Sequence, residues 1–304
     1  MIPRGSLPPF RRPAVVRCQR GDTDLDSAQR RIGGNELRGR IAISPDGDVE
    51  GDLEAAARAI AGAGGVTALT GAGVSVESGI PDFRSPGGLW SVFDPMEYAT
   101  LSCFLEDPEK AWTLYRALGK ILEGRTPNPA HRALADLERA GIVKGIVTQN
   151  VDGLHQAAGS RSVLEIHGEA TQLQCPRCRR LEPATAAHLE PGPVPVCGEC
   201  GSPLKPNLVL FEEPVRRLEA ISALVRRSEL MLVAGTSCEV APASLLPEEV
   251  LARRGSIVEM NLESTQLTGG GLGPNGFFVQ GPVGTTLPLL AAAVLAQGAA
   301  GGFA

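Results

Sequence analysis

The chain has 304 residues and a mass of 31.7 kDa, enough for one large α/β domain with a small appendage or for two modest domains. A net charge of −5 and a pI near 5.5 argue against nucleic acid as a direct partner, because a phosphate-binding surface normally leaves a basic excess. No apolar run reaches the roughly 18 residues that span a bilayer, so we expect a soluble, cytoplasmic protein without membrane contact. The sequence does not specify an oligomeric state.

Regular structure is expected from about residue 51 onward. Residues 1–50 carry Pro, Gly, Arg and Asp without helical or strand periodicity, which predicts a disordered N-terminal extension. After a helix-forming segment, short apolar runs alternate with helical patterns. The apolar runs lie in residues 64–70, 141–150, 162–168, 228–237 and 255–263, and the helical patterns in 130–141 and 214–227. This alternation predicts an α/β protein, with a Rossmann-like parallel sheet covered by helices on both faces.

A polar signature follows each apolar run. The signatures are GAG at 71–73, TQNVDGLH at 148–155, HGE at 167–169, GTS at 235–237 and NLE at 261–263. In open α/β sheets, ligands bind outside the carboxyl ends of the strands. The five signatures are therefore expected to line one crevice.

The first signature indicates a dinucleotide. A strand that runs into Gly71 and Gly73 lets backbone N–H groups approach a phosphate closely. The dehydrogenase fingerprint has a third Gly or Ala where this chain has Val76, so the loop indicates NAD without indicating hydride transfer. A plain strand-to-helix turn is the alternative interpretation.

Four histidines are available for acid–base chemistry. His167 ends a predicted strand at the ligand-bearing edge, which favours a general base over the alternative of a structural histidine. His131 opens a helical pattern and His188 lies between the cysteine pairs, so both are expected to be structural or exposed. His155 is expected to be a structural partner for its loop.

Further polar side chains are expected around the same crevice. Asn150 and Asp152 follow a strand, although a helix N-cap with an Asx turn is the alternative interpretation. Asp82 and Arg84 follow Pro81, which keeps them in a loop over the pocket. The residues expected to hold sugar hydroxyls are Thr236, Ser237, Asn261 and Glu263.

Two C-x-x-C pairs predict a zinc site. Cys175 and Cys178 are separated from Cys197 and Cys200 by 18 residues, a spacing typical of a four-thiolate site. The intervening segment is rich in proline and cannot build its own core, so it is expected to fold around the metal. Four thiolates close the coordination shell, which predicts structural zinc; two disulfides are the alternative. The remaining thiols, expected to be unpaired and partly buried, are Cys18, Cys103 and Cys238.

From about residue 52 to its end, the chain resembles the sirtuins of the bacterial type, a family of NAD-dependent protein-lysine deacetylases. The resemblance rests on ordered motifs: GAGVSVESGIPDFR, TQNVDGLH, IHG, CPRC, CGEC, PNLVLFEE, GTSCEVAPA and NLE. It implies transfer of the acetyl group from acetyl-lysine of a protein or peptide to ADP-ribose, with release of nicotinamide. The implied organisation is a discontinuous NAD-binding domain (51–170 and 205–300), a zinc module (171–204) and a helical insert (88–125) on the cofactor and acyl side of the cleft.

The resemblance also assigns roles position by position. His167 becomes the general base, with Asn150 beside it in the catalytic centre. Gly71, Ala72 and Gly73 are the implied contacts to the pyrophosphate. The cofactor loop is implied to carry Asp82, Phe83 and Arg84. Gln149 and Asn150 are implied to face the nicotinamide ribose. The implied contacts to the carboxamide are Val151 and Asp152. Those to the phosphate and adenosine side are Gly235, Thr236, Ser237, Asn261, Leu262, Glu263 and Val283.

Two positions depart from the family pattern. Relatives that prefer succinyl or malonyl groups carry Tyr-x-x-Arg, whereas here Tyr115 is followed by Leu118 and Arg116 points to another helix face. Without the guanidinium, a carboxylated acyl chain lacks its bidentate partner, so acetyl or apolar acyl groups are expected. Glu212 stands where the family usually has glycine; a positive φ there would strain the segment that pairs with substrate.

Two other functions remain open from the sequence. Glu212 in the substrate loop motivates a mono-ADP-ribosyltransferase on the same scaffold, in which a protein side chain attacks the ribose. A third hypothesis is a module that binds and senses NAD without converting it. The intact IHG and QNVD signatures count against it, because a sensor does not require a base.

Overall fold

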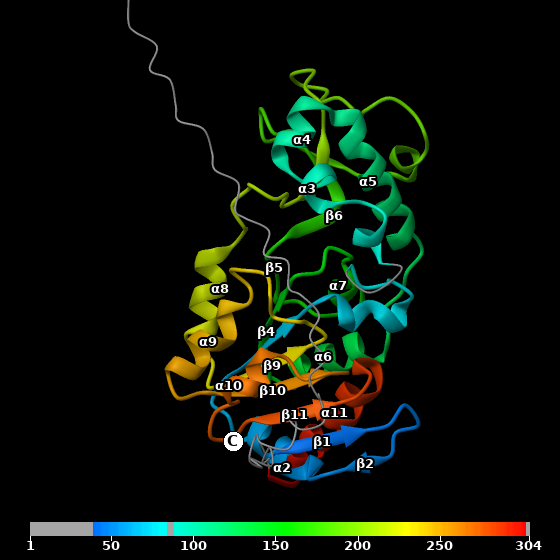
Figure 1. The fold of residues 1–304 in the computed structure, drawn as a ribbon. Coiled ribbons are helices and arrows are strands. Elements are labelled where there is room, and N and C mark those ends of the chain that lie inside the picture. The colour runs from blue at the N-terminus through cyan, green and yellow to red at the C-terminus, as the bar shows by residue number, and fades with distance from the viewer. Residues whose placement is uncertain (1–38, 84–87, 302–304) are drawn as a thin grey trace, which may run out of the picture. The chain divides into compact units, whose positions relative to one another are not determined.

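The computed structural model describes residues 39–83 and 88–301, and Figure 1 displays its elements. Its large sheet has eight strands in the order β2-β1-β11-β10-β9-β3-β4-β5. Every pairing is parallel except that of β1 with β2. The strands are β1 (Arg40–Ile43), β2 (Val49–Glu50), β3 (Val66–Thr70), β4 (Val143–Thr148), β5 (Val163–Glu165), β9 (Leu230–Ala234), β10 (Ser256–Asn261) and β11 (Phe277–Gln280).

Helices cover both faces of this sheet, as the sequence predicts. All residues of β3 and β9 are buried, and successive side chains of β9 enter two different cores. Leu232 packs in one core with α2 (Leu53–Ala61), α6 (Pro129–Arg139) and α11 (Val283–Gly301). Val233 packs in the other core with α8 (Leu218–Val225), α9 (Leu245–Ala252) and α10 (Gln266–Gly270). The Rossmann-like α/β fold class is confirmed.

The chain changes direction across the sheet at β3. From β3 it proceeds through β4 to β5 on one side, whereas β9, β10 and β11 lie on the other side. The carboxyl ends of β3 and β9 therefore form a topological switch point, the usual place for a ligand in an open parallel sheet. The turn after β3 continues into a 3-10 helix, η1 (Ala72–Ser78), and α7 (Leu154–Ala157) follows β4.

A second, three-stranded sheet carries the cysteine pairs. Its strands β6 (Gly168–Gln174), β7 (Leu181–Pro183) and β8 (Lys205–Leu208) are antiparallel in the order β7-β6-β8. The sheet thus takes in residues on both sides of the expected 171–204 range. This sheet shares one hydrophobic core with the helical segment at residues 89–122, and the sheet and this segment are the two parts described next. The helices of the two parts are η2 (Leu89–Ser91), α3 (Pro95–Tyr98), α4 (Leu101–Glu106), α5 (Pro108–Leu122) and η3 (Ala186–Leu189).

Tight contacts fix α5 to the small sheet and its loops. The indole Nε1 of Trp112 donates to the carbonyl oxygen of Leu204 at 2.8 Å, and Trp112 is 1% exposed. Arg116 Nη2 donates to the carbonyl oxygen of Gly192 at 2.8 Å. Because apolar side chains of both parts fill the same core, neither part has a separate core of its own.

The N-terminal prediction is wrong in one part. Residues 40–43 and 49–50 form strands, whereas the sequence predicted disorder up to residue 50; residues 1–38 lie outside the described residues. Ile41 and Ile43 are buried where β1 pairs with β11, a strand that the apolar run at 277–279 could have indicated. In the described chain, none of the helices combines the length and apolar character needed to cross a membrane.

Candidate active site and metal site

Two glycine turns meet at the switch point. The N–H of Gly71 donates to the carbonyl oxygen of Ala234 at 3.2 Å, and the N–H of Gly73 donates to that of Gly235 at 2.8 Å. A Cβ on Gly73 would lie 2.7 Å from the Gly235 Cα, and Gly235 has φ +60°, so neither position accepts a side chain without rearrangement. Backbone-to-backbone packing of this kind requires glycine at both places. The N–H groups of Gly71 and Gly73 are thus used inside the protein, whereas the sequence predicted that they approach a phosphate.

Gln149 and Asn150 extend this surface from the end of β4. Gln149 donates its backbone N–H to the Thr70 carbonyl at 3.0 Å and its Nε2 to Thr236 Oγ1 at 2.9 Å. Asn150 is buried, and its Nδ2 donates to the Gly71 carbonyl at 3.1 Å and to Ser75 Oγ at 3.0 Å. Because both amide hydrogens are used, Asn150 offers a ligand its acceptor oxygen, Oδ1.

Asp152 has two roles at once. Its Oδ1 accepts from the Leu154 N–H at 2.9 Å, which is the Asx turn of the alternative interpretation, although the N-cap of α7 is Gly153 and not Asp152. Its Oδ2 accepts from Ser75 Oγ at 2.7 Å. The neighbouring Val151 is half-buried and its carbonyl accepts from Ala170 N–H at 3.1 Å, so this turn contacts the small sheet.

His167 lies two residues beyond the end of β5 and directly precedes β6. Its Nδ1 is 3.1 Å from the carbonyl oxygen of Gln149. Because a carbonyl can only accept, this contact places the proton on Nδ1 and leaves a lone pair on Nε2. Burial lowers the pKa of His167, and the hydrogen bond to Gln149 opposes that shift. The ring is therefore neutral at neutral pH and able to accept a proton through Nε2.

Buried polar groups form a layer beneath the site; the sequence predicted a structural role for His155 but not the connection of His131 to Ser75. Ser75 gives its one proton to Asp152, so its oxygen can only accept from His131 Nε2, which lies 3.5 Å away. His131 is fully buried, although the sequence left open that it was exposed. It belongs to the capping box that starts α6 at Asn128, whose Nδ2 donates to the Val74 carbonyl at 2.7 Å. The motif Asn-Pro-x-His was the available sequence signal.

His155 completes this layer. It is 1% exposed; its Nε2 lies 2.9 Å from Thr70 Oγ1, and its ring centroid lies 4.9 Å from that of His131. Thr70 in turn donates to Thr148 Oγ1 at 2.9 Å, which joins the ends of β3 and β4. Through Ser75, this buried layer is hydrogen-bonded to the side chains of Asn150 and Asp152 in the turn after β4.

The ends of β9, β10 and β11 supply the far side of the site. Asn261 donates Nδ2 to the Thr236 carbonyl at 3.1 Å and to Glu259 Oε1 at 3.2 Å. Its own carbonyl accepts from the Gly281 N–H at 3.0 Å. Glu259 is fully buried and also accepts from Thr265 N–H at 3.0 Å, which fixes the turn after β10.

The remaining expected contacts are placed as follows. Leu262 and Glu263 are exposed in the turn after β10, and Ser237 follows Thr236 after β9. Val283 starts α11 and is buried. Ala72 starts η1 between the two glycines, and Asp82 precedes Phe83, whose ring lies 5.3 Å from Trp90. Arg84 lies outside the described residues.

The expected acyl side lies on α5. Tyr115 and Leu118 are 3% and 8% exposed and belong to the core shared with the small sheet. Burial raises the pKa of Tyr115, so its hydroxyl stays protonated. Arg116 instead points to the loop at Gly192, consistent with a different face of the helix.

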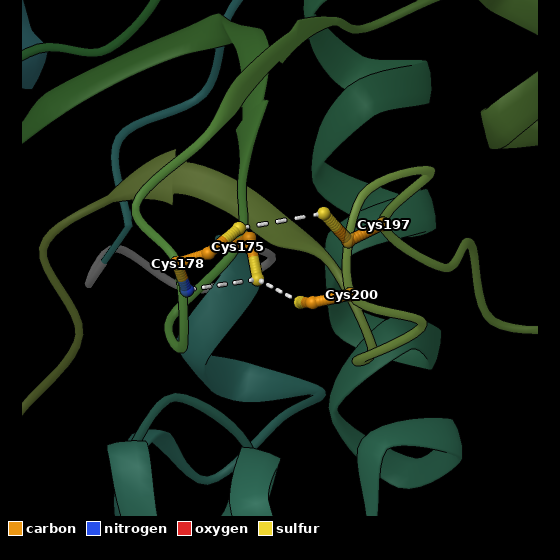
Figure 2. Close-up of side chains that lie close together, drawn as sticks. All are labelled: Cys175, Cys178, Cys197 and Cys200. Carbon is orange, nitrogen blue, oxygen red and sulfur yellow. Dashed lines mark hydrogen bonds between the residues drawn. The ribbon is translucent and has the colours of Figure 1, made fainter.

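The four clustered cysteines form a candidate metal site, drawn in Figure 2. Their Sγ atoms all lie within 4.8 Å of one another, with Cys175–Cys200 at 3.5 Å and Cys178–Cys197 at 3.6 Å. These distances exclude disulfides, whose S–S length is about 2.05 Å. A tetrahedral zinc with Zn–S bonds of about 2.3 Å separates its sulfurs by roughly 3.8 Å. The thiolates fit a zinc ion with a closed shell, which makes the metal structural.

Known proteins share this fold and much of the sequence. An NAD-dependent protein deacylase of Thermococcus sibiricus is 41% identical over 223 residues, which cover 71% of this chain and 88% of the relative. The solved structure of a Sir2 homolog in complex with NAD matches with a TM-score of 0.73 and 39% identity, covering 79% of this chain and 93% of that one. A mutant Sir2 with a deacetylated p53 peptide and 3'-O-acetyl ADP-ribose matches with a TM-score of 0.70 and 30% identity, covering 82% and 99%.

These neighbours place the chain among NAD-linked proteins of the Rossmann-like class. A model of the Sir2 family matches residues 71–242, more than half of the sequence. The chain belongs to the Sir2 family.

Removing the metal should destabilise the small sheet and the core it shares with α5. We expect Cys178→Ser to lose bound zinc and to lower the free energy of unfolding by at least ~3 kcal/mol, roughly 5–10 °C in Tm. Zinc content by mass spectrometry and thermal melts measure both effects. Cys103→Ser, which removes a thiol outside the cluster, is the control and should keep the zinc. Full zinc content in the Cys178 variant would contradict the assignment.

The buried histidines should make the protein sensitive to acid. Burial lowers the pKa of His131 to about 4 and that of His155 to about 3. Unfolded histidine titrates near 6.5, so below that pH the unfolded state binds more protons and the free energy of unfolding falls. We expect a loss on the order of 1–2 kcal/mol per histidine by pH 5, measured by urea unfolding.

The matched variants for this test are His155→Gln and His188→Gln. The first should flatten the pH dependence between pH 6.5 and 5. The second replaces a histidine of η3, outside the buried layer, and is the control. An unaltered slope in the His155 variant would show that this ring is already protonated in the folded protein.

Proposed function

We propose that this protein is an NAD-dependent protein-lysine deacetylase, which transfers the acetyl group of acetyl-lysine to ADP-ribose and releases nicotinamide. The observation that carries the proposal is His167, held through Nδ1 by Gln149 with Nε2 free to accept a proton, at the edge where the strand ends converge. Membership of the Sir2 family supports it. So do the NAD complex and the deacetylated peptide of the two structural neighbours.

NAD, when bound, supplies a ribose carbon from which nicotinamide leaves and which an acyl oxygen can attack. Residues of the chain bind and orient the reactants and accept a proton. We place the pyrophosphate at the glycine turns of Gly71 and Gly235, where the carboxyl ends of β3 and β9 meet. Asn150 presents Oδ1 to a hydroxyl donor, because both its amide hydrogens are used inside the protein. His167 takes a proton from a ribose hydroxyl through Nε2, which makes that oxygen nucleophilic toward the acyl carbon.

The four thiolates contribute no chemistry to the reaction in this scheme. A closed four-cysteine shell leaves zinc no position for water or substrate, so it stabilises the fold. We place the protein in the cytoplasm, where thiolates remain reduced and available for metal binding. Its partner in this scheme is an acylated lysine of a protein or peptide.

The proposal is tested by following both products by mass spectrometry with NAD and an acetyl-lysine peptide. We expect equal amounts of nicotinamide and deacetylated peptide. His167→Ala should lower kcat/KM by about 10²–10⁴, the usual contribution of a general base, and His188→Ala should not. Because the pKa of His167 is lowered, activity should decline with acid only below about pH 6.5, as the base becomes protonated.

Other outcomes of the same assay would overturn the proposal. Transfer of label from NAD to protein without peptide deacetylation would indicate a mono-ADP-ribosyltransferase. Binding of NAD with no product at all, in protein with full zinc content, would indicate a sensing module.

Acyl preference should respond to position 118. Leu118 lies on the same face of α5 as Tyr115 and carries no charge. Leu118→Arg should raise the ratio of desuccinylation to deacetylation in kcat/KM by about 10- to 100-fold, because a guanidinium pairs with a carboxylated acyl chain. Leu118→Met is the control of similar volume. An unchanged ratio in folded Leu118→Arg protein would place the acyl group elsewhere.

A further inference from the structure

Glu212 adopts a backbone conformation that suits glycine. Its φ is +77°, in the left-handed region, which disfavours residues with a Cβ. Position 212 thus has the positive φ that the sequence analysis considered, and its backbone is strained in the folded chain. Strain that persists at one residue calls for contacts that hold it there.

The Glu212 carboxylate supplies such contacts. Its Oε2 accepts from the backbone N–H of Ser102 at 2.9 Å, and its Oε1 accepts from Ser102 Oγ at 2.9 Å. Ser102 is in the first turn of α4, where N–H groups lack partners within the helix. A glycine at position 212 would provide neither bond.

The segment around Glu212, residues 209–213, connects α4 to the His167 turn. At one end, Val209 N–H donates to the His167 carbonyl at 2.8 Å. In the middle, the carbonyl of Phe211 accepts from the Leu101 N–H at 3.1 Å. At the other end, Glu213 pairs with the buried Lys205 Nζ at 2.8 Å. The segment is thus fixed at both ends, and Glu212 adds a side-chain link to α4.

Phe211 makes the segment relevant to substrate. Phe211 is 44% exposed, so its ring is accessible to a ligand, and it follows the strand β8 that leads past His167. A peptide whose acyl-lysine reaches His167 has to pass over neighbouring surface, and the 209–213 segment is bonded directly to the His167 backbone. An apolar ring in a fixed place lowers the ordering cost of binding.

We propose that Glu212 is a positioning residue: through Ser102 it fixes the 209–213 segment against α4, so that Phe211 forms a preformed wall for the acyl-lysine peptide. This inference rests on the proposed deacetylase function. It assigns to Glu212 no contact with the reacting atoms. The presence of glutamate instead of glycine at position 212 would then serve substrate binding. A binding measurement can distinguish this role from an effect on stability.

The test compares Glu212 variants by the Kd of a fluorescent acetyl-lysine peptide and by peptide KM. We expect Glu212→Gly to weaken Kd and to raise KM about 3- to 10-fold, with kcat and the KM for NAD within about twofold. Tm should change little, because relief of the left-handed strain offsets the lost hydrogen bonds. Glu212→Gln, whose amide can still bond Ser102, should retain most of the affinity.

Two further variants isolate the contact. Ser102→Ala should weaken peptide binding less than Glu212→Gly does, and should add nothing in the Glu212→Gly background, because both changes remove the same link. Arg254→Gly is the control: it relieves another left-handed position (φ +62°) just before β10, at the end of the sheet opposite the active site. It should leave peptide binding unchanged.

The proposal is overturned if Glu212→Gly binds peptide as tightly as the parent chain, or if Arg254→Gly weakens binding equally. It is also overturned if the Glu212→Gly and Ser102→Ala effects simply add. Failure of the deacetylase function is a separate result, because it would appear as a lack of turnover in the unsubstituted protein. The Kd comparison does not need turnover and still decides the role of Glu212.

Discussion

The close packing of two glycine turns is the constraint on which the candidate site depends. Gly73 and Gly235 bring the ends of β3 and β9 so near that backbone contacts backbone, and a Cβ at either place would collide. Because the sheet reverses its order at these two strands, the closest approach coincides with the place where parallel sheets bind ligands. The turns that carry Gln149, Thr236 and Asn261 are hydrogen-bonded around this centre.

The polar layer beneath the centre explains why side chains there have defined orientations. Asn150 and Asp152 are each held by Ser75, and Ser75 is held by a buried neutral histidine. A charged histidine at that depth would carry a large desolvation penalty, so the network is built from groups that bond without net charge, apart from one carboxylate. Preorganised dipoles of this type need little rearrangement when a ligand binds.

Features that depend on a short local pattern could be predicted from the sequence. Buried strands, the glycine turns and the cysteine pairs each have a signature within a few residues, and the fold class followed from their alternation. Contacts between distant segments had no such signature. His131 becomes part of the site only because α6 packs beneath η1, and Ser102 meets Glu212 across 110 positions of sequence. Strand β1 was missed because four residues are too short to display a period.

The connection between the two sheets has a mechanical consequence. Only Ile166 and His167 separate the last residue of β5, in the large sheet, from the first residue of β6, in the small one. The small sheet and α5 share a core, so they would turn as one rigid unit. Any hinge rotation between this unit and the large sheet would bend the backbone beside His167. His167, the general base in the proposed function, would then act also as a pivot, and the angle between the sheets would determine where its Nε2 points.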